Sequence, residues 1–260
     1  MGNILYAGES DIGFQRQVNE DFLYVKEWGD ITIAIVADGT GSTGTTYQPA
    51  SIATLEIAAV LKRLCDENPD TLWENAEVFI EEAFRTAGRV LGAFQVANEE
   101  LYHGFASSIA CCLVRGDEIV IANSGNTRIQ LIRKHTKTGE AQITLLTKDQ
   151  TVGQAMLDAG KYTFEEYHLS PERLRITGGL GVVAVPTVQT FRMPIRSNDF
   201  VLMTTDGIHY AIRPDAILDL VRRSDTCQEA VKTLIVAAKE LEYADNMTAV
   251  LLWNTSTGGK

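Results

Sequence analysis

The amino-acid sequence predicts an α+β fold in which antiparallel sheets are covered by helices. Apolar residues first alternate with the period of a strand, a helical block follows, and the strand period then returns before two last helices and a closing strand. This order lacks the regular alternation of strand and helix that builds a parallel sheet. A chain of 260 residues that is 45% hydrophobic can form one large domain or two small ones. Because no linker-like tract interrupts it, we expect one domain over residues 1–260.

The first part of the chain is predicted to hold two strands and then helices. Residues 19–37 form two strands joined by a turn at Gly29 and Asp30, because isoleucines occupy alternate positions from residue 31. The apolar spacing over 48–67 predicts a long buried helix. Residues 72–100 carry a further apolar face and are predicted to form one or two helices.

The second part returns to strands and is punctuated by glycine turns. We expect several strands over 105–134, and a mixed segment over 148–181 with a short helix near 154–159. The tail, 254–260, is expected to be frayed. The remaining elements are strands over 141–147, 187–195, 199–207 and 247–253, and helices over about 214–223 and 227–242.

Composition limits the possible partners and location. The formal net charge is −11 and the pI is near 4.9, which argues against nonspecific binding to nucleic acid or to an anionic membrane. No apolar run is long enough to span a bilayer, and the first residues do not resemble a signal peptide. The four cysteines form no metal-binding pair and are expected to be buried, reduced thiols. We expect a cytoplasmic monomer.

An apolar strand ends in a glycine-rich loop at Gly39, Gly41 and Gly44, which has the spacing of a dinucleotide-binding motif. That motif needs a second parallel strand after the next helix, ending in an acid. Asp66 lies at a suitable distance, but the helix runs directly up to it. Asp38 would also repel a pyrophosphate. We therefore reject the dinucleotide hypothesis, and a P-loop fails because no Gly-Lys-Ser/Thr follows.

Three acids instead mark the ends of predicted strands. Asp38 and Asp206 follow apolar strands and precede glycine, and Asp245 precedes the last strand. Any one of them alone would be a common turn residue. In an antiparallel sheet the end of one strand and the start of its neighbour share an edge, so the three can converge. Converging carboxylates repel, and a hard divalent ion such as Mg²⁺ or Mn²⁺ would resolve the repulsion.

Several segments, in order along the chain, resemble the motifs of the metal-dependent PP2C-type (PPM) protein serine/threonine phosphatases, in the single-domain form of bacteria. "DIGFQRQVNED" is similar to the opening D-x-G-x-x-R-x-x-N-E-D of that family, and "VADGTGSTG" is similar to its V-x-D-G-x-G-G segment. "ANSGNTRIQLI" resembles A-N-x-G-D-S-R, and "LLTKDQT" resembles L-T-x-D-H-S. "LMTTDGI" and "ADNMTAVLL" match the last two signatures, so the resemblance covers nearly the whole chain.

The resemblance implies a four-layer αββα sandwich of two mainly antiparallel sheets flanked by helices, with two divalent metal ions, Mg²⁺ or Mn²⁺, at one edge. It assigns Asp38 to both ions, and it assigns Glu20 and the carbonyl of Gly39 to one of them. Arg16 would grip the substrate phosphate, for which its planar fork is suited. The other implied residues are the metal ligands Asp206 and Asp245 and the supporting residues Asp21 and Asn246.

The implied activity is hydrolysis of phosphoserine and phosphothreonine by attack of a hydroxide that bridges the two metals. The substrate would be a phosphorylated protein, such as a partner kinase or its targets, recognised with the help of a flap at 148–181. Many relatives hold a third metal, but Asn126 and Tyr210 replace two acids of that site, so we expect it to be absent. Thr40 stands where some relatives have a histidine.

Two other functions remain open at this stage. A catalytically weak or silent relative could bind phosphoproteins or regulate a partner, which the loss of the acid at Asn126 favours. Retention of the other site residues opposes it, because buried acids are costly to maintain. A different two-metal phosphoesterase, such as a nuclease, is disfavoured by the acidic net charge and the lack of a basic stripe.

Overall fold

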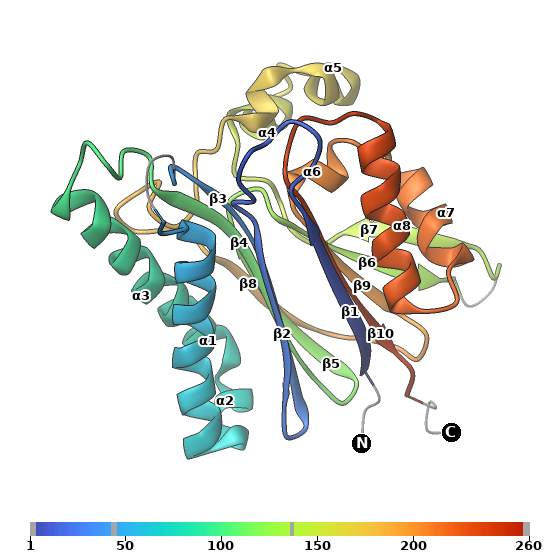
Figure 1. Ribbon diagram of the computed structural model, residues 1–260. Coiled ribbons are helices and arrows are strands. Elements are labelled where there is room, and N and C mark those ends of the chain that lie inside the picture. Colours follow the sequence, from blue (N-terminus) through green and yellow to red (C-terminus); the bar gives the residue numbers. More distant parts are fainter. Residues whose placement is uncertain (1–3, 43–45, 136–137, 257–260) are drawn as a thin grey trace.

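Two sheets with helices on their outer faces form the molecule (Figure 1), a computed structural model that describes residues 4–42, 46–135 and 138–256. Sheet A has the strand order β1 (Ile4–Asp11), β10 (Met247–Asn254), β9 (Phe200–Thr204), β6 (Arg128–Lys134) and β7 (Ala141–Leu145). Sheet B has the order β2 (Phe22–Trp28), β3 (Ile31–Thr40), β4 (Ala106–Arg115), β5 (Glu118–Ser124) and β8 (Gln189–Pro194). Neighbouring strands are antiparallel in both sheets of the described chain.

The helices form the outer layers. Sheet B is covered by α1 (Pro49–Glu67), α2 (Pro69–Glu74) and α3 (Ala76–Ala97), and sheet A by α7 (Pro214–Arg223) and α8 (Cys227–Glu240) (Figure 1). One apolar core lies under each helical layer and a third lies between the sheets. The predicted four-layer αββα sandwich is therefore confirmed.

The hairpin of β2 and β3 positions one end of the sandwich. Trp28 pairs with Ile31 across the two-residue turn predicted at Gly29 and Asp30. All residues from Ile31 to Ala37 are buried, because β3 is a central strand between α1 on one face and the other sheet on the opposite face. This rigid strand carries Asp38 to the edge of the sheet.

Strand β1 was not predicted, since the first strand was expected to begin only near residue 19. Its burial does not alternate regularly, with Ile4 and Ala7 buried and Leu5 and Tyr6 exposed between them. As an edge strand, β1 pairs with β10 alone, and its second half is not apolar. A strand without period-two burial gives no sequence signal of its own.

The segment at 148–181 contains α4 (Val152–Asp158), α5 (Phe164–Leu169) and the short 3-10 helix η1 (Pro171–Leu174). It lies above the end of the sandwich (Figure 1). A short helix, α6 (Asp206–His209), was also not predicted and follows β9 directly. The tail was expected to fray from residue 254, but Asn254 is buried in β10 and pairs with Ile4. Residues 257–260 lie outside the described residues.

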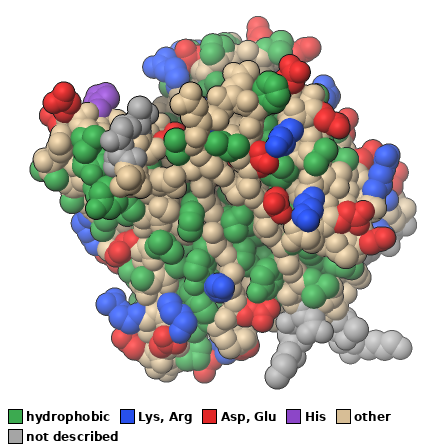
Figure 2. Space-filling model, in the orientation of Figure 1, with side chains coloured by type: hydrophobic (Ala, Val, Ile, Leu, Met, Phe, Trp, Pro, Cys, Tyr) green, Lys and Arg blue, Asp and Glu red, His purple; other side chains and the backbone are tan. Residues whose placement is uncertain are grey.

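Apolar side chains on the face drawn in Figure 2 gather in a band over the edge strands β1 and β2, and Lys, Arg, Asp and Glu are scattered around it. Leu5, with 52% of its surface exposed, belongs to one of these strands. All four cysteines are buried and unpaired, as predicted. Across the part of the chain that the structure describes, no helix is both long and apolar enough to span a membrane.

Candidate metal centre

Asp206 and Asp245 come together at the end of sheet A because the backbone around them packs very closely. Asp206 begins α6 immediately after β9, and Asp245 precedes β10, the neighbouring strand. A Cβ on Gly207 would lie 1.9 Å from the carbonyl oxygen of Asn246, so only glycine fits after Asp206. The Asp-Gly pair at 206–207 is therefore required by packing as well as by the site.

A second glycine fixes the loop between β1 and β2 against the same residues. Gly13 has a φ of +78°, and a Cβ there would lie 2.1 Å from the carbonyl oxygen of Asp245. Both the left-handed conformation and the close approach require glycine. This contact holds the loop that carries Arg16 and Glu20 over the start of β10.

Asn246 fastens that loop with three hydrogen bonds. Its Nδ2 donates to the carbonyl oxygens of Ile12 (2.8 Å) and Val18 (3.0 Å), and its Oδ1 accepts from the backbone N–H of Glu20 (2.9 Å). Asn246 is buried, so these bonds replace its contacts with water. Through the bond to the backbone of Glu20, Asn246 holds that residue in place, which agrees with the supporting role expected of it.

Most of the predicted site residues line one cavity of about 300 Å³. Asp38 and Gly39 enter it from the end of β3, and the loop and strand ends described above supply the others. Leu174 and Ile176, from the segment at 148–181, complete its rim. The predicted residues that line it are Arg16, Glu20, Asp38, Gly39, Asp206, Asp245 and Asn246.

Among the predicted metal ligands, the predicted phosphate-binding arginine and the predicted supporting residues, Asp21 is the one that does not line the cavity. It is buried behind it, where the hydroxyl of Thr205 donates to its Oδ2 at 2.8 Å. Desolvation, countered in part by hydrogen bonds from Thr248 and Thr205, raises its pKa to about 7, and the charges of Asp206 and Asp245 add to this. Asp21 therefore contributes charge to the centre without reaching it.

The acids of the cavity repel one another. The pKa of Asp38 is raised well above its usual value, mainly by burial and next by the charge of Asp206. Burial, followed by the charge of Asp245, raises the pKa of Asp206 to about 7. Such raised pKa values mean that the ionised cluster lacks a compensating positive charge. The guanidinium of Arg16 offsets only part of this negative charge, because its side chain is 47% exposed and water screens its charge.

Most of these carboxylates accept hydrogen bonds from donors within the protein. Arg16 pairs with Asp245 at 2.9 Å, Asn126 Nδ2 donates to Asp206 at 3.2 Å, and Glu20 accepts from the backbone and hydroxyl of Ser42. The Asp38 side chain has no hydrogen-bonded partner among the described residues. Within the same residues, no three His, Cys, Asp or Glu side chains already stand together as a ligand group. Oxygen donors alone, with excess negative charge, fit a hard divalent cation.

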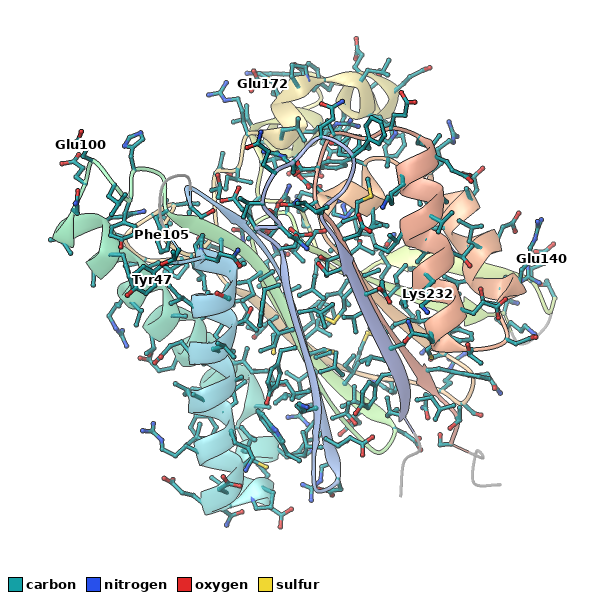
Figure 3. The ribbon with its side chains drawn as sticks, in the orientation of Figure 1. Tyr47, Glu100, Phe105, Glu140, Glu172 and Lys232 are labelled. Carbon is teal, nitrogen blue, oxygen red and sulfur yellow. The ribbon has the colours of Figure 1, made fainter. Side chains whose placement is uncertain are left out.

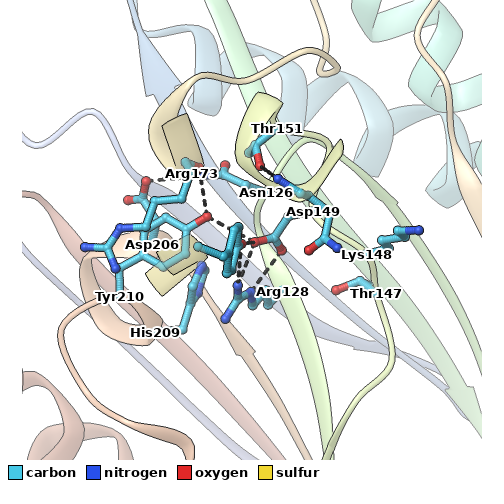
Figure 4. Close-up of polar contacts among 12 residues, drawn as sticks. Asn126, Arg128, Thr147, Lys148, Asp149, Thr151, Arg173, Asp206, His209 and Tyr210 are labelled. Atoms are coloured by element: carbon cyan, nitrogen blue, oxygen red, sulfur yellow. Dashed lines mark hydrogen bonds and ion pairs between the residues drawn. The ribbon is translucent and has the colours of Figure 1, made fainter. Parts of the chain in front are cut away.

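A second buried cluster lies beside the cavity and was not predicted as part of the site (Figure 4). Arg128 donates from Nε and Nη2 to the two carboxylate oxygens of Asp149, at 2.9 and 2.6 Å. The hydroxyls of Tyr167 and Tyr210 donate to the same carboxylate at 2.8 and 3.0 Å. Both charged residues occur in motifs quoted above, but neither motif indicates that they pair.

Ser108, which was not predicted as a site residue, also lines the cavity. Its Oγ accepts from the backbone N–H groups of Asn126 (2.8 Å) and Thr127 (2.7 Å). These bonds shape the turn between β5 and β6 and aim the Asn126 side chain at Asp206. The signal that could have identified Ser108 is its position directly across from Asp38 in the sheet.

The model of one protein family, protein phosphatase 2C, matches residues 14–251. The chain belongs to the protein phosphatase 2C family. The family expected from the order of the motifs is thus confirmed, and all the site residues named above lie within the matched range.

Curated 2C phosphatases of bacteria match most of the chain. It is 28% identical to the serine/threonine protein phosphatase PstP of Mycobacterium tuberculosis over 95% of this chain, and it spans 44% of the length of that protein. It is 27% identical to the protein phosphatase PhpP of Streptococcus pneumoniae, and the match covers 94% of both chains.

Solved 2C phosphatases share the fold. The crystal structure of M. tuberculosis PstP superposes with a TM-score of 0.81 at 26% identity, covering 97% of this chain and 99% of that one. The catalytic domain of the same phosphatase in complex with two manganese ions superposes with a TM-score of 0.77 at 25% identity, covering 96% and 97%.

Tyr210, expected to replace a third-metal acid of other 2C phosphatases, does not line the cavity. Its ring lies between two guanidinium groups, with the Cζ atoms of Arg173 and Arg128 at 4.7 and 5.1 Å from the ring centre. His209, the histidine nearest to Asp206 in sequence, is buried, and its Nδ1 lies 2.9 Å from the hydroxyl of Thr204. Burial lowers its pKa well below the usual value.

Proposed function

We propose that this protein is a metal-dependent phosphatase that hydrolyses phosphoserine and phosphothreonine in proteins. One observation carries the proposal: carboxylates from four distant segments line a single cavity beside an exposed arginine. Membership of the 2C family and the manganese complex of PstP support a divalent metal as the cofactor. Buried carboxylates with raised pKa values and little positive compensation supply the driving force for binding it.

Two divalent ions, Mg²⁺ or Mn²⁺, are the proposed cofactors. Asp38 would contact both, Glu20 and the Gly39 carbonyl would hold one, and Asp206 and Asp245 would hold the other. When bound, the ions supply a deprotonated water as the nucleophile and neutralise charge on the phosphate oxygens. Binding requires that Asp245, Asp206 and Glu20 exchange at least part of their contacts with Arg16, Asn126 and Ser42 for the metal.

Arg16 is proposed to bind the substrate phosphate. Its guanidinium stands at the cavity rim and carries a raised pKa, because the hydrogen bond and charge of Asp245 outweigh its desolvation. A metal on Asp245 would weaken this pair and free the guanidinium for two phosphate oxygens. Asp21 and Asn246 would act indirectly, by supporting Thr205 and the loop of Glu20.

The third metal site of other members is proposed to be absent. Asn126 is a neutral donor to Asp206, and Tyr210 is committed to the Arg128 and Asp149 cluster. A calorimetric manganese titration should therefore saturate at two ions per chain, and Asn126→Asp should add a weaker third. Three ions bound by the wild-type protein at moderate concentration would contradict the proposal.

The test of the activity is phosphate release from a phosphothreonine peptide with added Mn²⁺. We expect metal-dependent release that falls by at least about a hundredfold in Asp38→Ala and in Asp206→Asn, because each substitution removes a metal ligand. Asp215→Asn, an exposed acid on α7, is the matched control and should keep full activity. A folded wild-type protein that releases no phosphate would instead support a silent phosphoprotein-binding relative. Cleavage of DNA or RNA would support a nuclease.

The proposed partners are phosphorylated proteins, among them a serine/threonine kinase or its targets, and the proposed state is a cytoplasmic monomer. The acidic charge of −11 supports a partner other than nucleic acid. Light scattering on the purified protein tests the monomer, and a mass near twice 28.5 kDa would contradict it.

A further inference from the structure

A second, larger hollow of about 800 Å³ adjoins the acidic cavity. One wall of this hollow is formed by the C-terminal end of α3 and the segment that follows it. The other wall is formed by the loop at the end of the 148–181 segment. Thr40 and Ile176 line both hollows. The two are therefore neighbours that share a boundary, and we call the larger one the flanking groove.

Hydrogen bonds fix the two walls of the flanking groove to each other. The Nε2 of Gln95, on α3, donates to the carbonyl oxygens of Phe105 (2.9 Å) and Gly181 (3.0 Å). Ser107 and Leu180 exchange two backbone hydrogen bonds of 2.8 Å each. The groove is thus a built feature of the fold, which reduces the entropy lost when a ligand binds.

Tyr102 lines the groove and packs against two further aromatic rings behind it. The ring centre of Tyr102 lies 5.2 Å from that of Phe94 and 5.1 Å from that of Phe105. Figure 3 shows Phe105 at the base of the segment after α3 and Glu100 at its outer tip. The packing against Phe94 and Phe105 holds the Tyr102 ring, the aromatic side chain that lines the groove, in a fixed position.

The chemistry of the flanking groove differs from that of the acidic cavity. Its described lining includes one carboxylate, Glu99, one histidine, His103, and no lysine or arginine, so it lacks the permanent positive charge that a phosphate site would need. Val96 contributes an apolar side chain that is 88% exposed, and Val182 stands on the opposite wall. An apolar side chain that binds between them would be removed from water, which is favourable.

We propose that the flanking groove binds the substrate polypeptide next to its phosphorylated residue and favours an apolar side chain there. The proposal rests on the proposed phosphatase activity. With the phosphorylated side chain in the acidic cavity, a neighbouring residue of the polypeptide would enter the flanking groove across the shared boundary at Thr40 and Ile176. An extended chain advances about 3.3–3.6 Å per residue, so its next residues would follow the groove away from the cavity.

The experiment compares phosphothreonine peptides of equal length that carry leucine or serine beside the phosphothreonine, on either side. We expect leucine on one side to raise kcat/KM about tenfold, mainly through KM. Val96→Asn should remove most of this preference, and Val96→Leu should keep it. Val78→Asn is the matched control, because Val78 is an exposed valine of the same helix, far from the groove.

A small aryl phosphate, p-nitrophenyl phosphate with Mn²⁺, separates this proposal from the activity on which it rests. The wild-type protein, Val96→Asn and Val78→Asn should all hydrolyse it equally. Equal hydrolysis without any leucine preference overturns the groove and leaves the phosphatase proposal standing. Absence of hydrolysis of every substrate overturns both. A change of molecular mass in Val96→Asn would show that the groove is occupied by a second copy, and would also overturn the proposal.

Discussion

Asp149 and Asp206 are both buried near the same end of the sandwich, but their charges are balanced in different ways. Asp149 accepts two hydrogen bonds from Arg128, whose charge holds the pKa of that carboxyl below its usual value despite burial. Asp206 has only Asn126 as a partner among the described side chains, and its pKa rises to about 7. The protein compensates the charge of Asp149, whereas the charge of Asp206 is left to be neutralised by a proton or by a bound cation.

The difference shows how to separate structural from functional buried acids. A buried charge that is satisfied within the fold stabilises or specifies the structure. A buried charge whose neighbours are other acids is destabilising until a ligand binds, and such groups concentrate at functional sites. The two clusters stand side by side, since Tyr210 follows α6 directly and reaches Asp149.

The largest expected effect on stability comes from Asp149→Asn. Removing this charge leaves the Arg128 guanidinium buried without its ion-pair partner, which costs about 3–5 kcal/mol. We expect the Tm to fall by roughly 6–20 °C, since each kcal/mol corresponds to about 2–4 °C in a domain of this size. Thermal unfolding followed by circular dichroism, with EDTA present, measures the change.

Asp206→Asn provides the contrast to that prediction under the same conditions. It removes a repelling charge and keeps an oxygen that can accept from Asn126, so the metal-free protein should unfold at the same or a higher temperature. If Asp206→Asn is as destabilising as Asp149→Asn, the protein compensates the charges of the two aspartates in the same way, which would contradict the comparison.

Manganese should have the next largest effect. A ligand that binds only the folded state stabilises it by about 2.7 kcal/mol at a hundredfold excess over Kd. We expect the Tm of the wild-type protein to rise with Mn²⁺, and the rise to be mostly lost in Asp206→Asn. Asp149→Asn should start from a lower Tm and retain the rise. A rise of equal size in Asp206→Asn would show that the metal binds elsewhere.

The metal-free protein should also lose stability as pH increases towards neutrality. Asp21 and Asp206 have pKa values of about 7 in the folded protein, against 3.8 for an ordinary aspartate, so between these values the folded state holds protons that the unfolded state has released. Stability therefore falls as pH rises through this window and past the folded pKa values, by on the order of 3 kcal/mol between pH 6 and 8 for the two groups together, and levels off above pH 8. Asp149 has a lowered pKa and affects stability only in more acidic solution, where its contribution is lost.

Unfolding temperatures in EDTA from pH 5 to 8 measure this slope. Asp206→Asn should make the slope shallower, because one of the carboxyls with a raised pKa no longer titrates, whereas Asp21 and Asp38 still do. In Mn²⁺ the slope should reverse, since the metal competes with protons for the carboxylates and binds better as pH rises. A wild-type slope unaffected by EDTA or Mn²⁺ would contradict the assignment of these pKa values to the metal centre.

The sequence predicted the acidic cluster because its members occupy positions with a local signal. Asp38, Asp206 and Asp245 each adjoin a strongly apolar strand, and antiparallel pairing places strand ends at one edge. The α+β class follows from the same periodicity, whereas the four layers of the sandwich were implied by the resemblance to the PP2C-type phosphatases. The segment without periodic burial, β1, was missed for the corresponding reason.

The compensated cluster could not be predicted in the same way. Arg128 and Asp149 are separated by a hairpin, and Tyr210 reaches them from the end of α6, so only the tertiary structure brings them together. In the sequence, Tyr210 was noted only because it replaces an acid of the third metal site. The structure shows that its hydroxyl binds the carboxylate of Asp149. Contacts between distant side chains leave no periodic pattern in the chain.

Tyr210→Phe is expected to have the smallest effect and tests whether the two clusters act independently. The phenylalanine ring still fits between Arg128 and Arg173, and only the hydroxyl that bonds Asp149 is lost. The free energy of unfolding should fall by about 0.5–1.5 kcal/mol, the usual value of one hydrogen bond. Tyr167→Phe, which removes another hydroxyl from the same carboxylate, is the matched control and should have a similar effect. Urea unfolding measures both, and hydrolysis of p-nitrophenyl phosphate should be nearly unchanged in each. If Tyr210→Phe alone weakens manganese binding, then the compensated cluster holds Asp206 in position through α6, and the two regions form one coupled site.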